Sequence, residues 1–460
     1  MFSLPNQNVI IFNSPEFIFR ILPLSVLLCA LIPGGGFSGV LLLISLLLYW
    51  MADPSFFWLL IAVLFVNYML AWWMGCCERK AGRRLFLVLS VLCDFGLLAC
   101  FKFSLFPFRA GNRVMPLGIS FYIFRAVSYT ADVYTGKIRP ELSPFKLALY
   151  LYMFPVVVSG PITRYGQIGG QLEKNMSLSK VEEGLRIFIV GLASKVLLAD
   201  RIGILWHEIQ VIGFESISTP LAWMGAFAYT LMLYFDFNGY SLMAVGVGRM
   251  LGLTLPVNFR YPYAARSFTQ FWRRWHMTLS SWFRDYVYIP LGGSRKGKAR
   301  TCLNMLAVWL LTGIWHGNGW NFILWGLLLW LLLTVEKLFS RYWLEEHDVW
   351  SRLYMLLLIP VTWTVFAITD LRELAVYFSR LFPIFGAARG NVNSGDFIKY
   401  GKMFWPLFLL GWFFSRPWAE NWYKKTKENP LWTAVLLVVF WVCVYYLVNT
   451  SGNPFLYFSF

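Results

Sequence analysis

Charged side chains are scarce in this sequence. They make up 14% of the 460 residues, while 58% of the residues are hydrophobic; ordinary soluble domains have about 25% and 45 to 50%. This scarcity argues against a soluble enzyme and predicts an all-α polytopic membrane protein. Several apolar stretches reach the roughly 20 residues that a membrane-spanning helix needs. The apolar stretches lie at residues 17–32, 37–50, 55–74, 85–101, 145–158, 186–199, 219–235, 240–255, 302–335, 353–368, 403–414 and 431–448.

Acidic residues are much fewer than basic ones. Asp and Glu together number 23, Lys and Arg together number 40, and the net charge is +17. The basic residues cluster in short links between apolar stretches, at 78–84, 294–300 and 423–429. The positive-inside rule places such links on the cytoplasmic side of a membrane. We therefore interpret the charge as topology first and ligand binding second, and expect a lipid bilayer rather than nucleic acid as a partner.

The motifs of many enzyme classes are missing. None of the seven cysteines forms a CxxC pair or a Cys/His cluster, so neither a zinc site nor a disulfide framework is implied. GxSxG, Walker A and HExxH motifs are absent too. The sequence lacks an internal repeat, which weakens a transporter interpretation, and it lacks a Pro- or Ser-rich linker, which favours a single membrane domain over residues 1–460. A transfer reaction that needs one base is better supported than metal chemistry.

The segment 256–301 combines basic and aromatic residues. It holds nine Lys or Arg against one acid, Asp285. Within 267–293, aromatic residues recur every three or four positions, while Arg273, His276 and Arg284 share another helical face. This pattern predicts a helix that lies in the membrane interface. The arginines either only anchor this helix or also contact a phosphate-bearing ligand, because guanidinium groups fit phosphate oxygens.

A second unusual segment places His316 between two apolar arms. At about 1.5 Å per residue, the arms 302–315 and 320–335 are roughly 21 and 24 Å long, less than the hydrocarbon core of about 30 Å. These lengths favour a re-entrant hairpin with His316 at its tip, where Gly313, Gly317, Gly319 and Asn318 reverse the chain. Two full crossings that meet near the outer surface are the alternative.

An ionisable side chain at membrane depth is a functional-site hypothesis by default. A buried, neutral imidazole suits a general base, since one ring nitrogen can accept a proton; a structural histidine is the alternative. Of the four histidines, His207 and His347 have polar or loop-like neighbours, so His316 and His276 stand out. We expect the intramembrane acids Asp94 and Asp236 to be satisfied by neighbouring helices.

The chain resembles one known family over nearly its whole length. The segments "PYAARSFTQFWRRWHMTLSSWFRDYVYIPLGG" (262–293) and "GIWHGNGWNFILWG" (313–326) resemble the membrane-bound O-acyltransferase (MBOAT) family, in the branch of the bacterial alginate O-acetylation membrane protein. In two places the chain departs from this branch: Asn238 stands where a serine is common, and Asn318 where a small residue is common. Further stretches that resemble the same branch lie at 12–19, 115–138, 154–165, 234–252 and 453–460.

The resemblance implies a bundle of many helices around a central funnel or tunnel, with re-entrant and interfacial helices, in the bacterial cytoplasmic membrane. It implies that an acyl group, usually acetyl from cytoplasmic acetyl-CoA, passes across the membrane to an exported polysaccharide. An extracytoplasmic partner of the SGNH-hydrolase type typically completes the transfer, and no cofactor is bound. A related branch instead passes D-alanine from a carrier protein toward teichoic acids.

The resemblance also implies roles for individual residues. His316 matches the family's signature histidine and is expected to act as the general base, and His276 lies along the same passage. Arg273, Arg274 and Arg284 are expected to contact the CoA phosphates. Acylation of a lysolipid or a protein, and transport of a lipid-linked or polymeric sugar without bond formation, remain alternatives. Four further residues are expected to support the site: Trp315, Asn318, Asp285 and Asp236.

Overall fold

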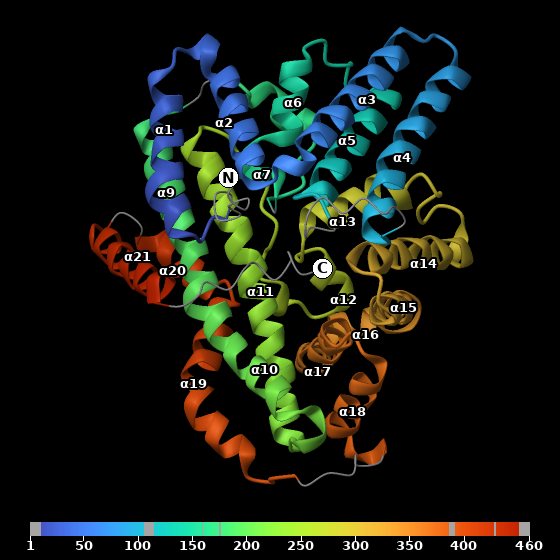
Figure 1. Cartoon of the computed structure of the whole chain (residues 1–460). Coiled ribbons are helices and arrows are strands. Elements are labelled where there is room, and N and C mark those ends of the chain that lie inside the picture. Colours follow the sequence, from blue (N-terminus) through green and yellow to red (C-terminus); the bar gives the residue numbers. More distant parts are fainter. Residues whose placement is uncertain are drawn as a thin grey trace. The chain divides into compact units, whose positions relative to one another are not determined.

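The computed structural model describes residues 11–104, 115–158, 160–173, 176–385, 392–426 and 429–449. Every regular element within these ranges is a helix (Figure 1), as the composition predicts. The segment 453–460, which resembles the family, lies outside the described residues. Six helices in the described ranges are long and apolar enough to cross a membrane: Gly34–Ala52, Pro54–Cys76, Lys80–Lys102, Trp320–Ser340, Asp348–Ala367 and Leu431–Asn449.

The chain forms two compact units. Unit 1 takes in residues 1–192, 240–257 and 440–454. Helices α3, α4 and α5 pack against one another in this unit (Figure 1). The helices that begin in its first segment are η2 (Phe17–Ile21), α1 (Leu22–Leu31), η3 (Gly34–Gly36), α2 (Phe37–Ala52), η4 (Pro54–Phe56), α3 (Phe57–Cys76), α4 (Lys80–Lys102), α5 (Ile119–Tyr134), α6 (Pro144–Tyr152), α7 (Phe154–Val157), α8 (Tyr165–Ile168), η5 (Gly169–Gln171) and α9 (Leu178–Ala193).

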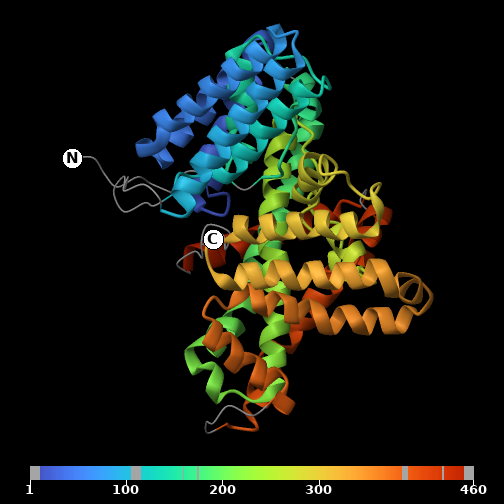
Figure 2. The same ribbon diagram turned by 90° about the vertical axis from the view of Figure 1, so that its right-hand side faces the viewer.

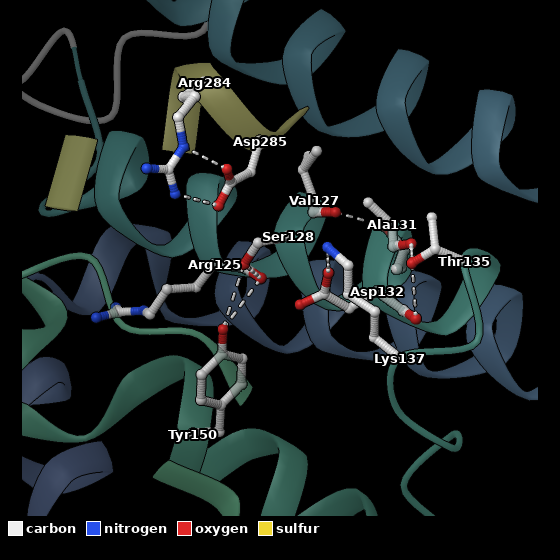
Figure 3. Close-up of polar contacts among 11 residues, drawn as sticks. Arg125, Val127, Ser128, Ala131, Asp132, Thr135, Lys137, Tyr150, Arg284 and Asp285 are labelled. Carbon is white, nitrogen blue, oxygen red and sulfur yellow. Dashed lines mark hydrogen bonds and ion pairs between the residues drawn. The ribbon is translucent and has the colours of Figure 1, made fainter. Parts of the chain in front are cut away.

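Polar side chains buried in unit 1 are bound by neighbouring helices. Asn67 of α3 donates to Asp94 of α4 over 2.9 Å, and Ser90 donates to Asn67 over 3.0 Å. A neighbouring helix therefore binds one oxygen of Asp94, as expected. On α5, the buried Arg125 donates to the carbonyl oxygens of Leu151 and Val156 at 2.6 and 2.7 Å. Figure 3 shows Arg125 on its helix, with Tyr150 directed toward the neighbouring backbone and Ser128.

Unit 2 takes in residues 193–239, 258–439 and 455–460. Helices α14, α15 and α17 form a stack of neighbours within it (Figure 2). The remaining helices of the chain are η6 (Ser194–Ala199), α10 (Asp200–Ile212), η7 (Phe214–Ser216), α11 (Thr219–Met250), η8 (Pro262–Ala264), α12 (Phe268–Trp272), α13 (Met277–Phe283), η9 (Arg284–Tyr288), α14 (Gly297–His316), α15 (Trp320–Val335), η10 (Glu336–Ser340), α16 (Arg341–Glu346), α17 (Asp348–Ala367), α18 (Leu371–Leu381), η11 (Pro383–Phe385), α19 (Asp396–Phe414), α20 (Trp418–Thr426) and α21 (Leu431–Asn449).

Helix α11 joins two apolar stretches that the sequence separates. The stretches 219–235 and 240–255 are divided by polar residues, yet the helix runs unbroken from Thr219 to Met250. The dividing residues find partners without leaving the helix: Asp236 pairs with Lys195, and Tyr240 donates to Asn13 over 3.0 Å. A polar interruption therefore does not break a helix when its side chains are satisfied by packed neighbours.

The arms around His316 are longer than the sequence predicts. Helix α14 begins at Gly297, inside the basic link, and α15 continues into η10 as far as Ser340. Their 20 and 21 residues correspond to about 30 and 31 Å at 1.5 Å per residue. The residues that lengthen α14 include Lys298 and Arg300, so its apolar part stays short, and only α15 with η10 is among the six helices that are long and apolar enough to cross a membrane. The re-entrant hairpin therefore stays a prediction.

Two glycines let α14 and α15 cross closely. A Cβ on Gly313 would lie 2.5 Å from the carbonyl oxygen of Phe322, and one on Gly326 would lie 2.6 Å from that of Trp309. Both contacts are with backbone atoms, so no side chain can move aside. Small residues at membrane helix crossings commonly permit such an approach.

We expect Gly326→Ala to destabilise the protein by about 1 to 3 kcal/mol, because its methyl group overpacks the crossing. The matched control is Gly401→Ala in α19, where a Cβ meets nothing within 4 Å; it should be neutral or slightly stabilising. Unfolding of both variants in detergent micelles measures the difference, and equal midpoints would contradict a close crossing.

Candidate active site

Unit 2 contains a cavity of about 150 Å³ that both singled-out histidines line. Helices α11 to α15 and α17 contribute its walls, and most of the lining side chains are aromatic or aliphatic. Apolar pockets with a few converging polar groups are the usual form of small-molecule sites. Five tryptophans line this cavity: Trp272, Trp275, Trp309, Trp325 and Trp363.

His316 is the last residue of α14, and its ring is held among aromatic rings. The ring centroids of Trp315, Trp325 and Phe366 lie 4.6, 5.2 and 5.0 Å from that of His316. The side chain is buried, with 9% of its surface exposed. Trp315 therefore lies beside His316 but is outside the cavity wall, and Asn318 lies exposed in the link to α15.

The glycines around His316 are needed for a different reason from the chain reversal that the sequence predicts. Gly317 is extended, with φ −171°, and Gly319 has φ −76°, so neither needs the left-handed region. A Cβ on Gly317 would instead lie 2.0 Å from a ring carbon of Phe322. Gly313 lies inside α14 rather than in a turn. Steric room between the two helices, not turn geometry, therefore explains these glycines.

The interfacial helix predicted for 267–293 is broken. Helix α12 ends at Trp272, and α13 begins only at Met277. Between them His276 has φ 40° and ψ 54°, a left-handed conformation that is uncommon outside glycine. Arg273, His276 and Arg284 therefore do not share a continuous helical face. Periodicity failed here because it does not detect a single residue that reverses the sign of φ.

Asn258 holds the residues around this break. The Nδ1 atom of His276 lies 3.0 Å from Oδ1 of Asn258, which also accepts from the backbone N–H and hydroxyl of Thr278 at 3.2 and 2.9 Å. The ring of Phe237 packs edge-on against His276 at 4.7 Å. His276 is 2% exposed, and this burial lowers its pKa to about 3. The imidazole is therefore neutral at physiological pH.

The predicted phosphate-contacting arginines lie outside the cavity wall. Arg273 is exposed at the end of α12, and Arg274 is partly buried beside it. Arg284 is exposed and binds its neighbour Asp285 with two contacts, at 2.7 and 3.2 Å (Figure 3). Asp285 therefore neutralises part of the charge of Arg284.

Asp236 belongs to a buried ion cluster. Nζ of Lys195 lies 2.6 Å from Asp236 and 2.8 Å from Asp200, and the side chains of Lys195 and Asp236 are each 3% exposed. The expectation that a neighbouring helix satisfies Asp236 is confirmed. Sequence reasoning missed Lys195, although a lysine inside the apolar stretch 186–199 was a readable signal. Because Phe237 follows Asp236 and lines the cavity, the cluster fixes part of the cavity wall.

Glu336 is a second residue that the sequence did not reveal. It is buried and accepts from the backbone N–H groups of Phe268 and Thr269, at 2.5 and 2.9 Å. These are the first residues of α12, whose N–H groups have no partner within the helix. Glu336 therefore fixes the start of the helix that carries Trp272 to the cavity. No group of three His, Cys, Asp or Glu side chains suited to a metal occurs in the described part of the chain.

Comparison with known proteins identifies the family. The family model of the membrane-bound O-acyltransferases matches residues 46–369, a range that contains both histidines and the whole cavity lining. The chain belongs to this family. The resemblance read from its motifs is thereby confirmed, and this MBOAT protein is an acyltransferase with several membrane-crossing helices.

Three relatives show where this MBOAT protein stands within the family. It is 31% identical to a probable alginate O-acetylase AlgI of Pseudomonas putida, over 98% of this chain and 100% of that protein. It is 32% identical to a peptidoglycan O-acetyltransferase of Helicobacter pylori, over 79% and 78%. It is 28% identical to a teichoic acid D-alanyltransferase of Bacillus subtilis, over 50% and 61%.

We expect Lys195→Met to destabilise this MBOAT protein by about 3 to 5 kcal/mol, because it leaves the buried carboxylate of Asp236 and the partly buried one of Asp200 without their cation. The matched control is Lys137→Met, since Lys137 also pairs with an aspartate, Asp132, but is 56% exposed. Loss of such an exposed pair costs about 0 to 1 kcal/mol. Denaturant unfolding in micelles compares the two variants; a Lys195→Met protein as stable as the control would show that the cluster is not structural.

Proposed function

We propose that this protein is an O-acetyltransferase that takes acetyl groups from cytoplasmic acetyl-CoA and passes them across the membrane toward hydroxyls of an exported polysaccharide. The observation that carries the proposal is the single cavity that both His276 and His316 line. Of the three relatives named above, the two that agree over 98% and 79% of this chain are named O-acetylase or O-acetyltransferase, whereas the D-alanyltransferase agrees over 50%. The proposal includes an SGNH-hydrolase-type partner outside the bacterial cytoplasmic membrane.

The size and chemistry of the cavity support a small, uncharged acyl group. Its volume is about 150 Å³, and its wall is mostly aromatic, so it suits a small acyl group without charge. We place this cavity on the family's central passage, which a thioester enters from one side and a hydroxyl from the other. The CoA phosphates stay in the cytoplasm because charged groups are costly to bring into the membrane.

In the proposed mechanism, neutral His316 acts as the general base. It takes the proton from the attacking hydroxyl as the hydroxyl oxygen bonds to the thioester carbonyl carbon. The tetrahedral intermediate collapses with cleavage of the carbon–sulfur bond, and the departing thiolate of CoA takes the proton from His316. An ester and a free thiol result, with no oxidation or reduction. His276 lies on the same cavity and positions the donor or carries a proton.

We expect His316→Ala to lower polymer acetylation in cells or proteoliposomes by roughly 10² to 10⁴-fold, which is the usual contribution of a general base. The matched control is His347→Ala, since His347 is exposed and outside the cavity. Both variants must reach normal membrane levels. Undiminished acetylation by folded His316→Ala protein would contradict the role of His316 as general base.

The arginines beside His276 supply the proposed contact with the donor's phosphates. Arg273 is exposed and has charge to offer a phosphate oxygen, whereas part of the charge of Arg284 is already neutralised by Asp285. Arg273 and Arg274 are therefore the stronger candidates of the three predicted arginines.

We expect Arg273→Gln to raise the KM for acetyl-CoA about 5- to 50-fold with little change in kcat, because a lost charge-assisted hydrogen bond is worth about 1.5 to 3 kcal/mol when unscreened. Added salt should shrink the difference from the wild type. The control is Arg372→Gln on α18, an exposed arginine outside the cavity wall. Initial rates with radiolabelled acetyl-CoA measure both, and a fall in kcat alone would contradict a phosphate contact.

A further inference from the structure

Asn258 stands outside the cavity wall but directly behind one of its histidines. It is 2% exposed and lies in the link between α11 and α12. Its backbone carbonyl accepts from the N–H of Met277 at 2.9 Å, and its side-chain Oδ1 contacts His276 and Thr278. The same residue therefore binds the start of α13 through both backbone and side chain.

The orientation of the Asn258 amide follows from its partners. The backbone N–H of Thr278 can only donate a hydrogen bond, and it lies 3.2 Å from the side-chain atom assigned as Oδ1. That atom must therefore be the carbonyl oxygen and not the amide nitrogen, since two donors facing each other would repel. The positions of oxygen and nitrogen in an asparagine amide are otherwise ambiguous. Here they are fixed by the backbone N–H of Thr278, because this group cannot accept a hydrogen bond.

The fixed amide in turn determines which nitrogen of His276 carries the proton. Oδ1 of Asn258 can only accept, so Nδ1 of His276, 3.0 Å away, must donate. In a neutral imidazole the other nitrogen then has no proton and presents a lone pair. This nitrogen, Nε2, is buried and has no hydrogen-bond partner within the described structure.

We propose that Asn258 is a positioning residue that holds His276 as the Nδ1–H tautomer and so leaves Nε2 as a hydrogen-bond acceptor for a hydroxyl or thiol hydrogen of a substrate in the cavity. This inference rests on the proposed function, because it gives His276 the accepting role in acyl transfer. It assigns a chemical task to a residue that no motif marks.

The backbone supports the same assignment. A non-glycine residue in the left-handed region is strained and persists where its surroundings enforce it. Here the enforcing contacts come from 258–260: Asn258 accepts from Met277, and Arg260 donates to the carbonyl of Arg274 at 2.9 Å. The edge-on ring of Phe237, at 4.7 Å, limits rotation of the imidazole. In this strained conformation the imidazole of His276 contacts Asn258 and also lines the cavity.

The first test reads the tautomer directly and needs no enzymatic activity. Protein labelled with ¹⁵N-histidine is reconstituted in lipid at neutral pH, and His276→Gln assigns the signal among the four histidines. We expect a protonated Nδ1 and an unprotonated Nε2 in the wild type and in Asn258→Asp, whose carboxylate still accepts from Nδ1–H. We expect a mixture of tautomers or the opposite one in Asn258→Leu. An unprotonated Nδ1 in the wild type, or an unchanged tautomer in Asn258→Leu, overturns the inference.

The second test separates positioning from general structural damage. Thiol release from acetyl-CoA is followed in membrane vesicles of expressing cells, which keep the natural acceptor and any partner. We expect Asn258→Leu to lower kcat by roughly 10²-fold with KM within about threefold of the wild type, and Asn258→Asp to restore most of kcat. The matched control is Asn304→Leu, because Asn304 is also 2% exposed but binds the carbonyl of Gly293 away from the cavity.

The outcomes distinguish this inference from the proposed function. If Asn304→Leu lowers kcat as much as Asn258→Leu, Asn258 is only structural and the inference fails. If the wild-type vesicles release no thiol, the proposed function fails, while the tautomer of His276 is still read by the first test. If Asn258→Leu does not fold, the wild-type tautomer and the Asn258→Asp variant still decide the matter.

Discussion

The structure depends on one constraint: a charged or polar group removed from water must find its partner inside the protein. Three buried groups satisfy it, and each fixes one wall of the same cavity. Lys195 pairs with Asp236, next to the lining residue Phe237; Glu336 binds the start of α12; and Asn258 binds the start of α13. The first two partnerships join segments far apart in the sequence, and the third joins residues twenty positions apart, so buried polar groups help to locate the site.

The two histidines are held in different ways on that cavity. Aromatic rings surround His316 at 4.6 to 5.2 Å, and the close crossing of α14 and α15 determines where its helix ends. His276 instead sits at a backbone break, and its Nδ1 faces an amide oxygen. Two imidazoles in one cavity therefore have distinct environments, which is the usual way for one site to give two similar groups separate tasks.

Much of the fold could be predicted from the sequence, since long apolar runs between basic links indicate where the long helices form. His276 and His316 also stood out, because an ionisable side chain is rare in or beside an apolar stretch. The errors have local causes. Helix α14 extends through the charged residues 297–300 because a helix end is not bound to the end of an apolar run. The positive φ of His276 is enforced by contacts with 258–260, which no periodicity within 267–293 contains. Asn258 and Lys195 were missed because their roles depend on contacts with His276 and with two aspartates. Such contacts form only in the folded chain.

The aromatic wall of the cavity bears on how much acyl donor would be lost to water. Indole and phenyl faces offer water few hydrogen bonds, so a wall with five tryptophans would, under the proposed function, keep water from attacking the thioester. Under the proposed function, acyl groups would then be consumed at the rate at which hydroxyl acceptors arrive. The supply of polymer outside the membrane would in this way determine how fast acetyl-CoA is used inside the cell.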